Sequence, residues 1–241
     1  MKKRRNLSPG ALTAPLPPVM VTVGDMEKSN VLTVAWTGIL ATVPPKTYVS
    51  IRPSRHSYGM LKESGEFVIN LPPAILAREV DFVGIYTGAK MDKFEKCGFT
   101  KTASEKVAPP TIAECPLALE CRVCEVKGMG SHDVFIADIL GVSAHDDLFD
   151  EAGRLCLERA NLLAYAHGEY FALGEKLGKF GFSTAKTQTK VVKNQRNSPK
   201  KEENKGASSS KGASQEASAE LKEPFYLAVA KKNNRRGGRR K

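Results

Sequence analysis

The sequence predicts a mainly β domain with a few helices on its rim, arranged as a closed or nearly closed antiparallel barrel. Three observations lead to this fold class. Short runs rich in β-branched and aromatic residues recur between residues 19 and 143, proline and glycine separate these runs, and few segments have the length of a long helix. The 241 residues suit one domain of roughly 170 residues with appended ends.

The first part of the chain predicts three strands. A turn at residues 25–29 and the prolines at 44–45 separate them, and Pro53 ends the third because proline has no amide to donate to a sheet. We expect strands at residues 19–23, 31–37 and 47–51.

The remaining elements follow from the same patterns. Proline pairs and the turn at residues 127–130 separate further β-rich runs, whereas residues 74–86 place apolar side chains at helical spacing. We expect strands at residues 66–71, 117–126 and 133–143. We expect helices at residues 58–63, 74–86, 92–97 and 154–166.

The start of the first helix is a candidate anion site. Ser57 precedes residues 58–63 and is a plausible N-cap, with Arg55 two positions before it. Free amides, a hydroxyl and a guanidinium at a helix start favour a bound phosphate. A capped helix with a solvated arginine explains these residues equally well, so they do not decide the matter alone.

Seven sequence blocks, in order and in register, resemble the flavin reductase-like family, and within it the flavoredoxin branch. The resemblance runs from about residue 15 to about residue 185 and includes closing segments at residues 170–174 and 177–183. The seven blocks are residues 30–36, 44–45, 55–57, 65–71, 92–95, 120–121 and 130–137. The family's fold is an antiparallel Greek-key split β-barrel that binds FMN, so the resemblance implies this fold and cofactor.

The resemblance also implies a set of cofactor-binding residues, but no catalytic nucleophile, proton-transfer pair or metal ligand. The expected FMN-binding residues are Asn30, Thr33, Ala35, Trp36, Thr37, Ser50, Arg52, Arg55, His56, Ser57, Lys93, His132 and Tyr165. Family members are usually homodimers with the cofactor near the subunit contact, and we expect the same arrangement.

Several of these residues also have simpler interpretations. A lone histidine such as His132 is more often structural, Lys93 could lie on a solvated helix face, and Trp36 could belong to the core. The resemblance instead places His132 and Trp36 beside the flavin ring and Lys93 near its pyrimidine or phosphate. It gives Tyr165, in the expected late helix, a place near the cofactor, and Asn30 could hydrogen-bond the ring or ribityl chain.

Two other motifs are weak. Cys121 and Cys124 form a CxxC pair, but no second ligand pair follows at zinc spacing, and positions three apart in a strand point to opposite faces. The segment Gly128-Met-Gly130 is too short and lies too late in the chain for a dinucleotide fingerprint, which requires a strand, G-x-G-x-x-G and a helix. The odd number of five cysteines favours reduced thiols.

The basic charge lies at the chain ends. Residues 186–241 contain 16 Lys and Arg against 5 Asp and Glu, which equals the net charge of +11, so residues 1–185 sum to zero. We therefore expect a basic flexible segment at 1–14, the folded domain at 15–185, and a disordered low-complexity tail at 186–241. The tail could contact RNA, an anionic surface or an acidic partner, or it could be a solubilising extension.

These inferences predict a cytoplasmic flavoprotein that binds FMN non-covalently and transfers electrons. No apolar run reaches the ~20 residues of a membrane span, and no signal-peptide pattern opens the chain. The electron donor could be NAD(P)H, as in a flavin reductase, or a redox protein, as for an electron carrier. A third interpretation is a non-catalytic flavin-binding or nucleic-acid-binding module that uses the basic tail.

Overall fold

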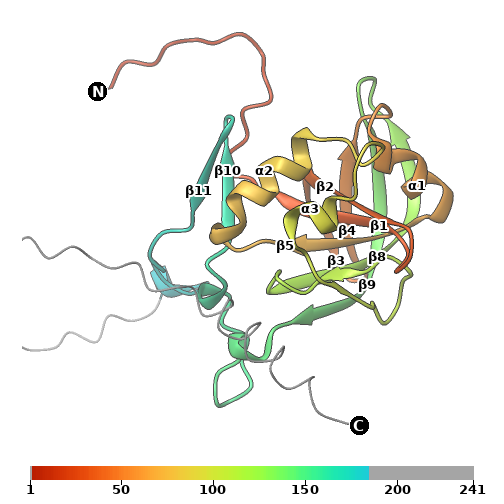
Figure 1. The fold of residues 1–241 in the computed structure, drawn as a ribbon. Coiled ribbons are helices and arrows are strands. Elements are labelled where there is room, and N and C mark those ends of the chain that lie inside the picture. Colours follow the sequence, from red (N-terminus) through yellow and green to blue (C-terminus); the bar gives the residue numbers. More distant parts are fainter. Residues whose placement is uncertain (1, 185–241) are drawn as a thin grey trace, which may run out of the picture. The chain divides into compact units, whose positions relative to one another are not determined.

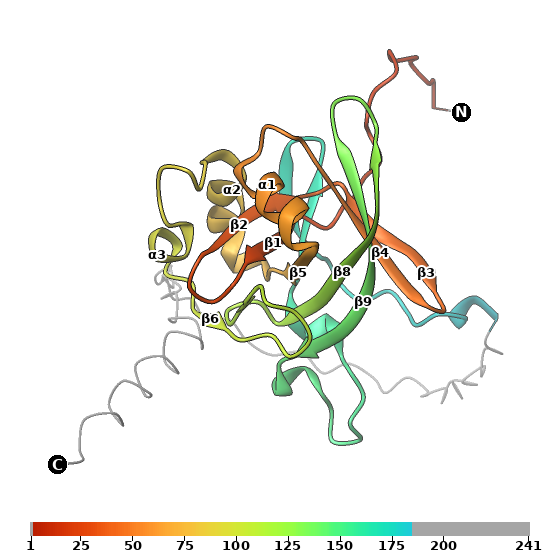
Figure 2. The same ribbon diagram turned by 90° about the vertical axis from the view of Figure 1, so that its right-hand side faces the viewer.

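The computed structural model describes residues 2–184, and its centre is a seven-stranded antiparallel sheet. The strand order is β2-β1-β5-β8-β9-β4-β3 (Figures 1 and 2). The strands are β1 (Val19–Gly24), β2 (Ser29–Val34), β3 (Thr37–Thr42), β4 (Pro45–Ile51), β5 (Glu66–Leu71), β8 (Leu117–Gly128) and β9 (Asp133–Ala144). The predicted mainly antiparallel β fold is confirmed.

The sheet curls around an interior core. Alternate residues of β1 point inward, where Val21 and Val23 pack with Phe67 and Phe135 from β5 and β9. A hydrogen bond joins the curled sheet near its end strands. The Ser50 amide donates to the Trp36 carbonyl at 2.9 Å, and Trp36 lies in the connection between β2 and β3. The inward face of the barrel is thus filled by side chains, and any ligand site must lie outside it.

Three helices cover the rim, in agreement with the expected positions. They are α1 (His56–Ser64), α2 (Ala77–Ile85), which follows a 3-10 turn at Ala74–Leu76, and α3 (Lys93–Cys97). Figure 1 shows α2 and α3 in front of β1 and β2. A second core joins them there, since Val80, Val83 and Phe94 pack with Met20 and Val31 from the outer side of those strands.

One expected strand is divided. The run 31–37 contains the end of β2 at Val34 and the start of β3 at Thr37, with Ala35 and Trp36 between them. The run has uniform β propensity, but the chain changes direction at this corner to pass from one edge strand of the sheet to the other. The Thr37 hydroxyl donates to the Tyr48 carbonyl at 2.5 Å and ties the start of β3 to β4.

The expected helix at 154–166 is wrong. The segment contains a short 3-10 helix at Leu157–Ala160 and then strand β10 (Leu163–Ala166), which pairs with β11 (Glu169–Ala172). Asn161 has a left-handed backbone with φ of 45° and ends the 3-10 helix. Both edges of β10 are bonded, because β11 lies on one side and Leu16 on the other. Non-local pairing therefore overrides the helical pattern of this segment.

The rest of the described chain is short or irregular. Two-residue strands β6 (Lys101–Thr102) and β7 (Thr111–Ile112) pair with each other, and 3-10 turns occur at Asp146–Leu148 and Phe182–Thr184. Within residues 2–184, no helix has the length and apolar character needed to cross a membrane. The expected tail at 186–241 lies outside the described residues, and the proposed domain limits remain predictions.

Candidate functional site

A cavity of about 650 Å³ opens between the corner after β2, the start of α1, the end of α2 and the β10–β11 hairpin. This volume lies within the usual range of small-molecule sites. Twelve of the thirteen residues expected to bind the cofactor line it, from Asn30 on β2 to Tyr165 on β10. The exception is Thr37, whose side chain is buried and bonded to β4.

One end of the cavity is rich in cations and helix-start amides. The side chains of Arg52, Ser54, Arg55 and His56 line it just before and at the start of α1. The His56 and Ser57 amides belong to the first helical turn, so they have no acceptor within the helix. Such amides, with arginines beside them, form a favourable environment for an anion.

The expected N-cap is wrong by two positions. Arg55 occupies the cap position with an extended backbone and no side-chain capping bond, and Ser57 lies inside the first turn. The buried hydroxyl of Ser57 instead accepts a hydrogen bond from Asn30 Nδ2 at 2.6 Å. A contact that spans 27 residues thus fixes Ser57, and the local pattern could not reveal it.

The loop after α2 lies directly against this pair. A Cβ built on Gly88 would lie 2.1 Å from Asn30 Oδ1, so only glycine fits without displacing the Asn30 amide. Gly84 also approaches β2 closely, since its added Cβ would lie 3.2 Å from the Thr33 Cβ. The Thr33 hydroxyl donates to the Val80 carbonyl and further fixes α2 on β2. These contacts form a firm wall for the cavity.

Lys93 lies behind this wall and is almost fully buried. Its ammonium donates to the Val31 carbonyl at 2.9 Å and to the Val83 carbonyl at 2.8 Å, which leaves one of its three N–H groups for the cavity that it lines. Burial, and after it the charge of Arg55, lowers the pKa of Lys93 to about 8. Lys93 is thus a buried group that holds β2 to α2, and the alternative interpretation of a solvated helix face is wrong.

Arg55 links the start of α1 to the end of α2. Its Nη1 donates to the Gly84 carbonyl at 2.9 Å, which holds the guanidinium at the cavity. Among the residues that line the cavity, Arg52, Arg55 and Lys93 are basic, and Asp81 is the single acidic residue. The cavity is therefore cationic within a segment, residues 1–185, whose formal charge is zero.

Two parallel aromatic rings stand at the cavity rim. Trp36 and His132 have ring centroids 6.5 Å apart and planes that differ by 3°. Burial, and then the charges of Arg52 and Arg55, lowers the pKa of His132. The histidine is therefore mainly neutral near pH 7, and both rings offer flat surfaces to a planar ligand. Ala35 and Ser50 add small side chains to the same lining.

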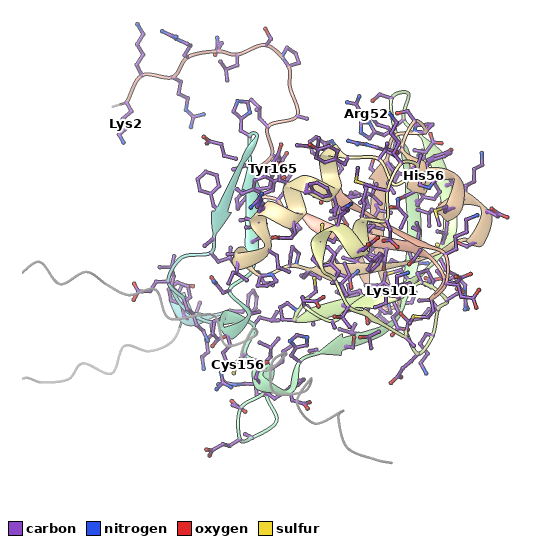
Figure 3. All side chains as sticks on the ribbon, viewed as in Figure 1. Lys2, Arg52, His56, Lys101, Cys156 and Tyr165 are labelled. Carbon is purple, nitrogen blue, oxygen red and sulfur yellow. The ribbon has the colours of Figure 1, made fainter. Side chains whose placement is uncertain are left out.

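The hairpin end of the cavity contains tyrosines. Tyr165 and Tyr170 face each other across the β10–β11 pair, and the Tyr170 hydroxyl donates to Asp81 on α2 at 3.2 Å. Figure 3 shows Tyr165 well apart from Arg52 and His56, on the side of the hairpin. The cavity thus has a cationic end and a tyrosine end.

Sequence reasoning missed about half of the lining. The missed residues include Ser54, Asp81, Tyr170 and the segment 83–88, which comprises the end of α2 and the start of the following loop. A signal existed for the loop, because Thr87 and Gly88 directly follow an amphipathic helix. No local signal marks Asp81 or Tyr170, which meet only in the folded chain.

The described residues also bear on the minor motifs. Cys121 is buried and Cys124 is exposed, as expected for positions on opposite faces of a strand. Within residues 2–184, no cluster of three His, Cys, Asp or Glu side chains has the geometry of a metal site.

Comparison with known proteins identifies the family. The chain belongs to the family described as flavin reductase like domain, whose model matches residues 12–174. An uncharacterized protein of Archaeoglobus fulgidus is 40% identical over 129 residues, which is 54% of this chain and 72% of the relative.

Solved structures agree with this assignment. Flavoredoxin of Desulfovibrio vulgaris (Miyazaki F) is 30% identical with a TM-score of 0.71, over 76% of this chain and all of that one. The FMN-binding protein from Thermus thermophilus, solved with bound 1-cyclohex-2-enone, is 27% identical with a TM-score of 0.63, over 74% of this chain and 99% of that one. These likenesses confirm the resemblance and the split-barrel fold.

Proposed function

We propose that this protein is a flavoprotein that binds FMN non-covalently and transfers electrons. The main supporting observation is that one cavity combines a cationic helix start with flat aromatic surfaces at its rim. FMN has the matching parts, a phosphate and a planar ring. When bound, the flavin supplies the redox chemistry, and the protein supplies anchoring, orientation and electrostatic tuning.

The phosphate belongs at the start of α1. Arg52, Arg55 and the Ser57 hydroxyl line the cavity there, beside free first-turn amides. The Asn30 side chain orients Ser57, and Gly88 leaves room for Asn30. These contacts set the phosphate site before a ligand arrives, which reduces the entropy cost of binding.

The ring belongs beside Trp36 and His132. Both lie at the cavity rim with parallel planes, and Lys93 has one N–H group left for a polar edge of the ring or for the phosphate. A positive charge near a flavin ring stabilises its electron-rich reduced form, so Lys93 would raise the flavin potential.

Two modes of electron transfer remain within this proposal. A flavin reductase accepts electrons from NAD(P)H, whereas a flavoredoxin-like carrier accepts them from another redox protein. The Thermus protein was solved with bound 1-cyclohex-2-enone, which supports small carbonyl compounds as a further class of ligand for this protein. A homodimer with the cofactor near the subunit contact is part of the proposal, on the strength of the family assignment.

A visible absorption spectrum tests the proposal. The purified full chain is incubated with FMN, freed of unbound ligand by gel filtration, and scanned. We expect flavin bands that coelute with the protein in near-equimolar amount. Absence of retained flavin at micromolar protein would contradict the proposal. Oxidation of NADH and NADPH by the loaded protein, measured against a protein-free FMN control, then separates the reductase from the carrier.

A further inference from the structure

The Tyr165 side chain is fixed in place at the tyrosine end of the cavity. Its backbone amide donates to the Leu16 carbonyl and its carbonyl accepts from the Leu16 amide, both at 2.8 Å, while β11 pairs along the other edge. Its ring packs edge-on against Tyr170, with centroids 5.4 Å apart and an angle of 63°. Since the strand and the ring are both held, Tyr165 has a defined place in the cavity lining.

The neighbouring hydroxyl is already committed. Tyr170 donates to Asp81, and burial followed by the Asp81 charge raises the pKa of Tyr170 to about 12. The Tyr165 hydroxyl, in contrast, makes no hydrogen bond to any residue in the described part of the chain, and it is not among the fully buried polar atoms. It is therefore a donor with no partner among the described residues, on a side chain that lines the cavity.

The surroundings of this donor select for an uncharged acceptor. Asp81 lies at this end, whereas Arg52, Arg55 and Lys93 attract anions to the other end. The aromatic faces of Tyr165 and Tyr170 favour a planar partner. A ring that bears a neutral carbonyl oxygen satisfies both conditions, because it packs on the aromatic rings and accepts one hydrogen bond.

We propose that the Tyr165 hydroxyl donates a hydrogen bond to the carbonyl oxygen of a small, planar, uncharged ring compound bound at the tyrosine end of the cavity. This inference rests on the proposed FMN function, since such a ring would be the second reactant beside the flavin. The ring can come from an electron acceptor, such as a cyclic enone, or from the carboxamide-bearing nicotinamide of an electron donor. The shared feature is the neutral carbonyl.

Calorimetric titration of the FMN-loaded full chain tests the inference. The probes are 2-cyclohexen-1-one, nicotinamide and cyclohexene, which lacks the carbonyl. We compare the unchanged chain with Tyr165→Phe and with Tyr86→Phe, which removes the hydroxyl of an exposed tyrosine in the same cavity lining. The expected result is that Tyr165→Phe weakens at least one carbonyl probe about three- to tenfold, which is the effect of one lost neutral hydrogen bond.

The controls define the outcomes. Tyr86→Phe should leave carbonyl-probe affinity unchanged, and any weak binding of cyclohexene should be equal in all chains. FMN affinity is also measured in Tyr165→Phe, because Tyr165 is one of the residues expected to bind the cofactor. If Tyr165→Phe weakens binding of the enone, the site is assigned to an electron acceptor. If it weakens binding of nicotinamide, the site is assigned to the electron donor.

Other outcomes overturn the inference. If both carbonyl probes bind Tyr165→Phe with the same affinity as the unchanged chain, the hydroxyl is not their donor. The same conclusion follows if the probes bind neither of these two chains. In both cases the proposed FMN function survives. If Tyr165→Phe loses FMN, Tyr165 holds the cofactor and not a second ligand. If the unchanged chain retains no FMN, the proposed function fails and the inference fails with it.

Discussion

The cationic end and the tyrosine end of the cavity are built in different ways. The cationic end draws Arg52, Ser54, Arg55, His56 and Ser57 from six consecutive positions where β4 passes into α1. The tyrosine end joins residues from three distant segments, because Leu16 pairs with Tyr165 and α2 supplies Asp81 to Tyr170 on β11. One end is therefore local in sequence and the other is assembled only by the fold.

The two constructions suit different tasks. A phosphate needs many donors in a small volume, and consecutive residues at a helix start supply them together. The tyrosine end supplies one fixed donor and aromatic surface, which suits a ligand that must be selected and released. We therefore expect changes at the cationic end to affect cofactor affinity, and changes at the tyrosine end to affect a second ligand.

The largest expected effect separates the two ends directly. Arg55→Ala should weaken FMN binding by about 1.5 to 3 kcal/mol, because it removes a charge-assisted hydrogen bond to the phosphate. Fluorescence titration of FMN measures the loss. Arg78→Ala is the matched control, since Arg78 is exposed on α2 and does not line the cavity. Equal FMN affinity in Arg55→Ala and the unchanged chain would remove Arg55 from the phosphate site.

A glycine pair tests how strongly the cationic end depends on its wall. Gly88→Ala places a Cβ against the Asn30 amide, so it should lower the free energy of unfolding by about 1 to 3 kcal/mol and weaken FMN. Gly59→Ala, within α1, meets no atom within 4 Å and should stabilise the helix by about 0.5 to 1 kcal/mol. Urea denaturation measures both, and equal stability of the two variants would refute the tight contact at Gly88.

A pH series examines the buried cation between the two ends. Lys93 is protonated below its pKa of about 8 and loses its charge as the pH rises above that value. A bound anion favours the charged form, so FMN affinity should fall above pH 8 by up to tenfold per pH unit. A phosphate monoester is already fully charged there, with its second pKa near 6.

Lys93→Met provides the comparison for this series. It should bind FMN more weakly than the unchanged chain at pH 7, but its FMN affinity should change little between pH 7 and 9.5. Flavin fluorescence measures both. Circular dichroism at each pH checks that the variant remains folded, because the Val31 and Val83 carbonyls lose their donor. A decline with pH that persists in Lys93→Met would assign it to another group.

The smallest expected effect concerns the end of the chain. A chain that ends at residue 185 retains all described cavity residues and the whole family match at 12–174. It should bind FMN as well as the full chain does, and it should lose any salt-sensitive binding to RNA or anionic lipid, because residues 186–241 carry the net charge of +11. Loss of FMN on truncation would place part of the cofactor site beyond residue 185.

The sequence predicts the cationic end better than the tyrosine end for a physical reason. Arg55, His56 and Ser57 are neighbours in the chain, so their chemistry is visible in a short window even though the capping role of Ser57 was wrong. The strand state of β10 depends on pairing with β11 and Leu16, and its own residues favour a helical interpretation. Asp81 and Tyr170 are 89 positions apart, and only their contact gives them a role.

The most direct test of the account compares FMN with riboflavin, which differs from FMN only by lacking the phosphate. Dissociation constants for both are measured by fluorescence titration on the purified full chain at about 0.15 M salt, where surface charges are largely screened. We predict that FMN binds at least tenfold more tightly than riboflavin, and that Arg55→Ala removes most of this difference while Tyr165→Phe leaves it unchanged. Equal affinity for the two flavins in the unchanged chain would contradict a phosphate site at the start of α1.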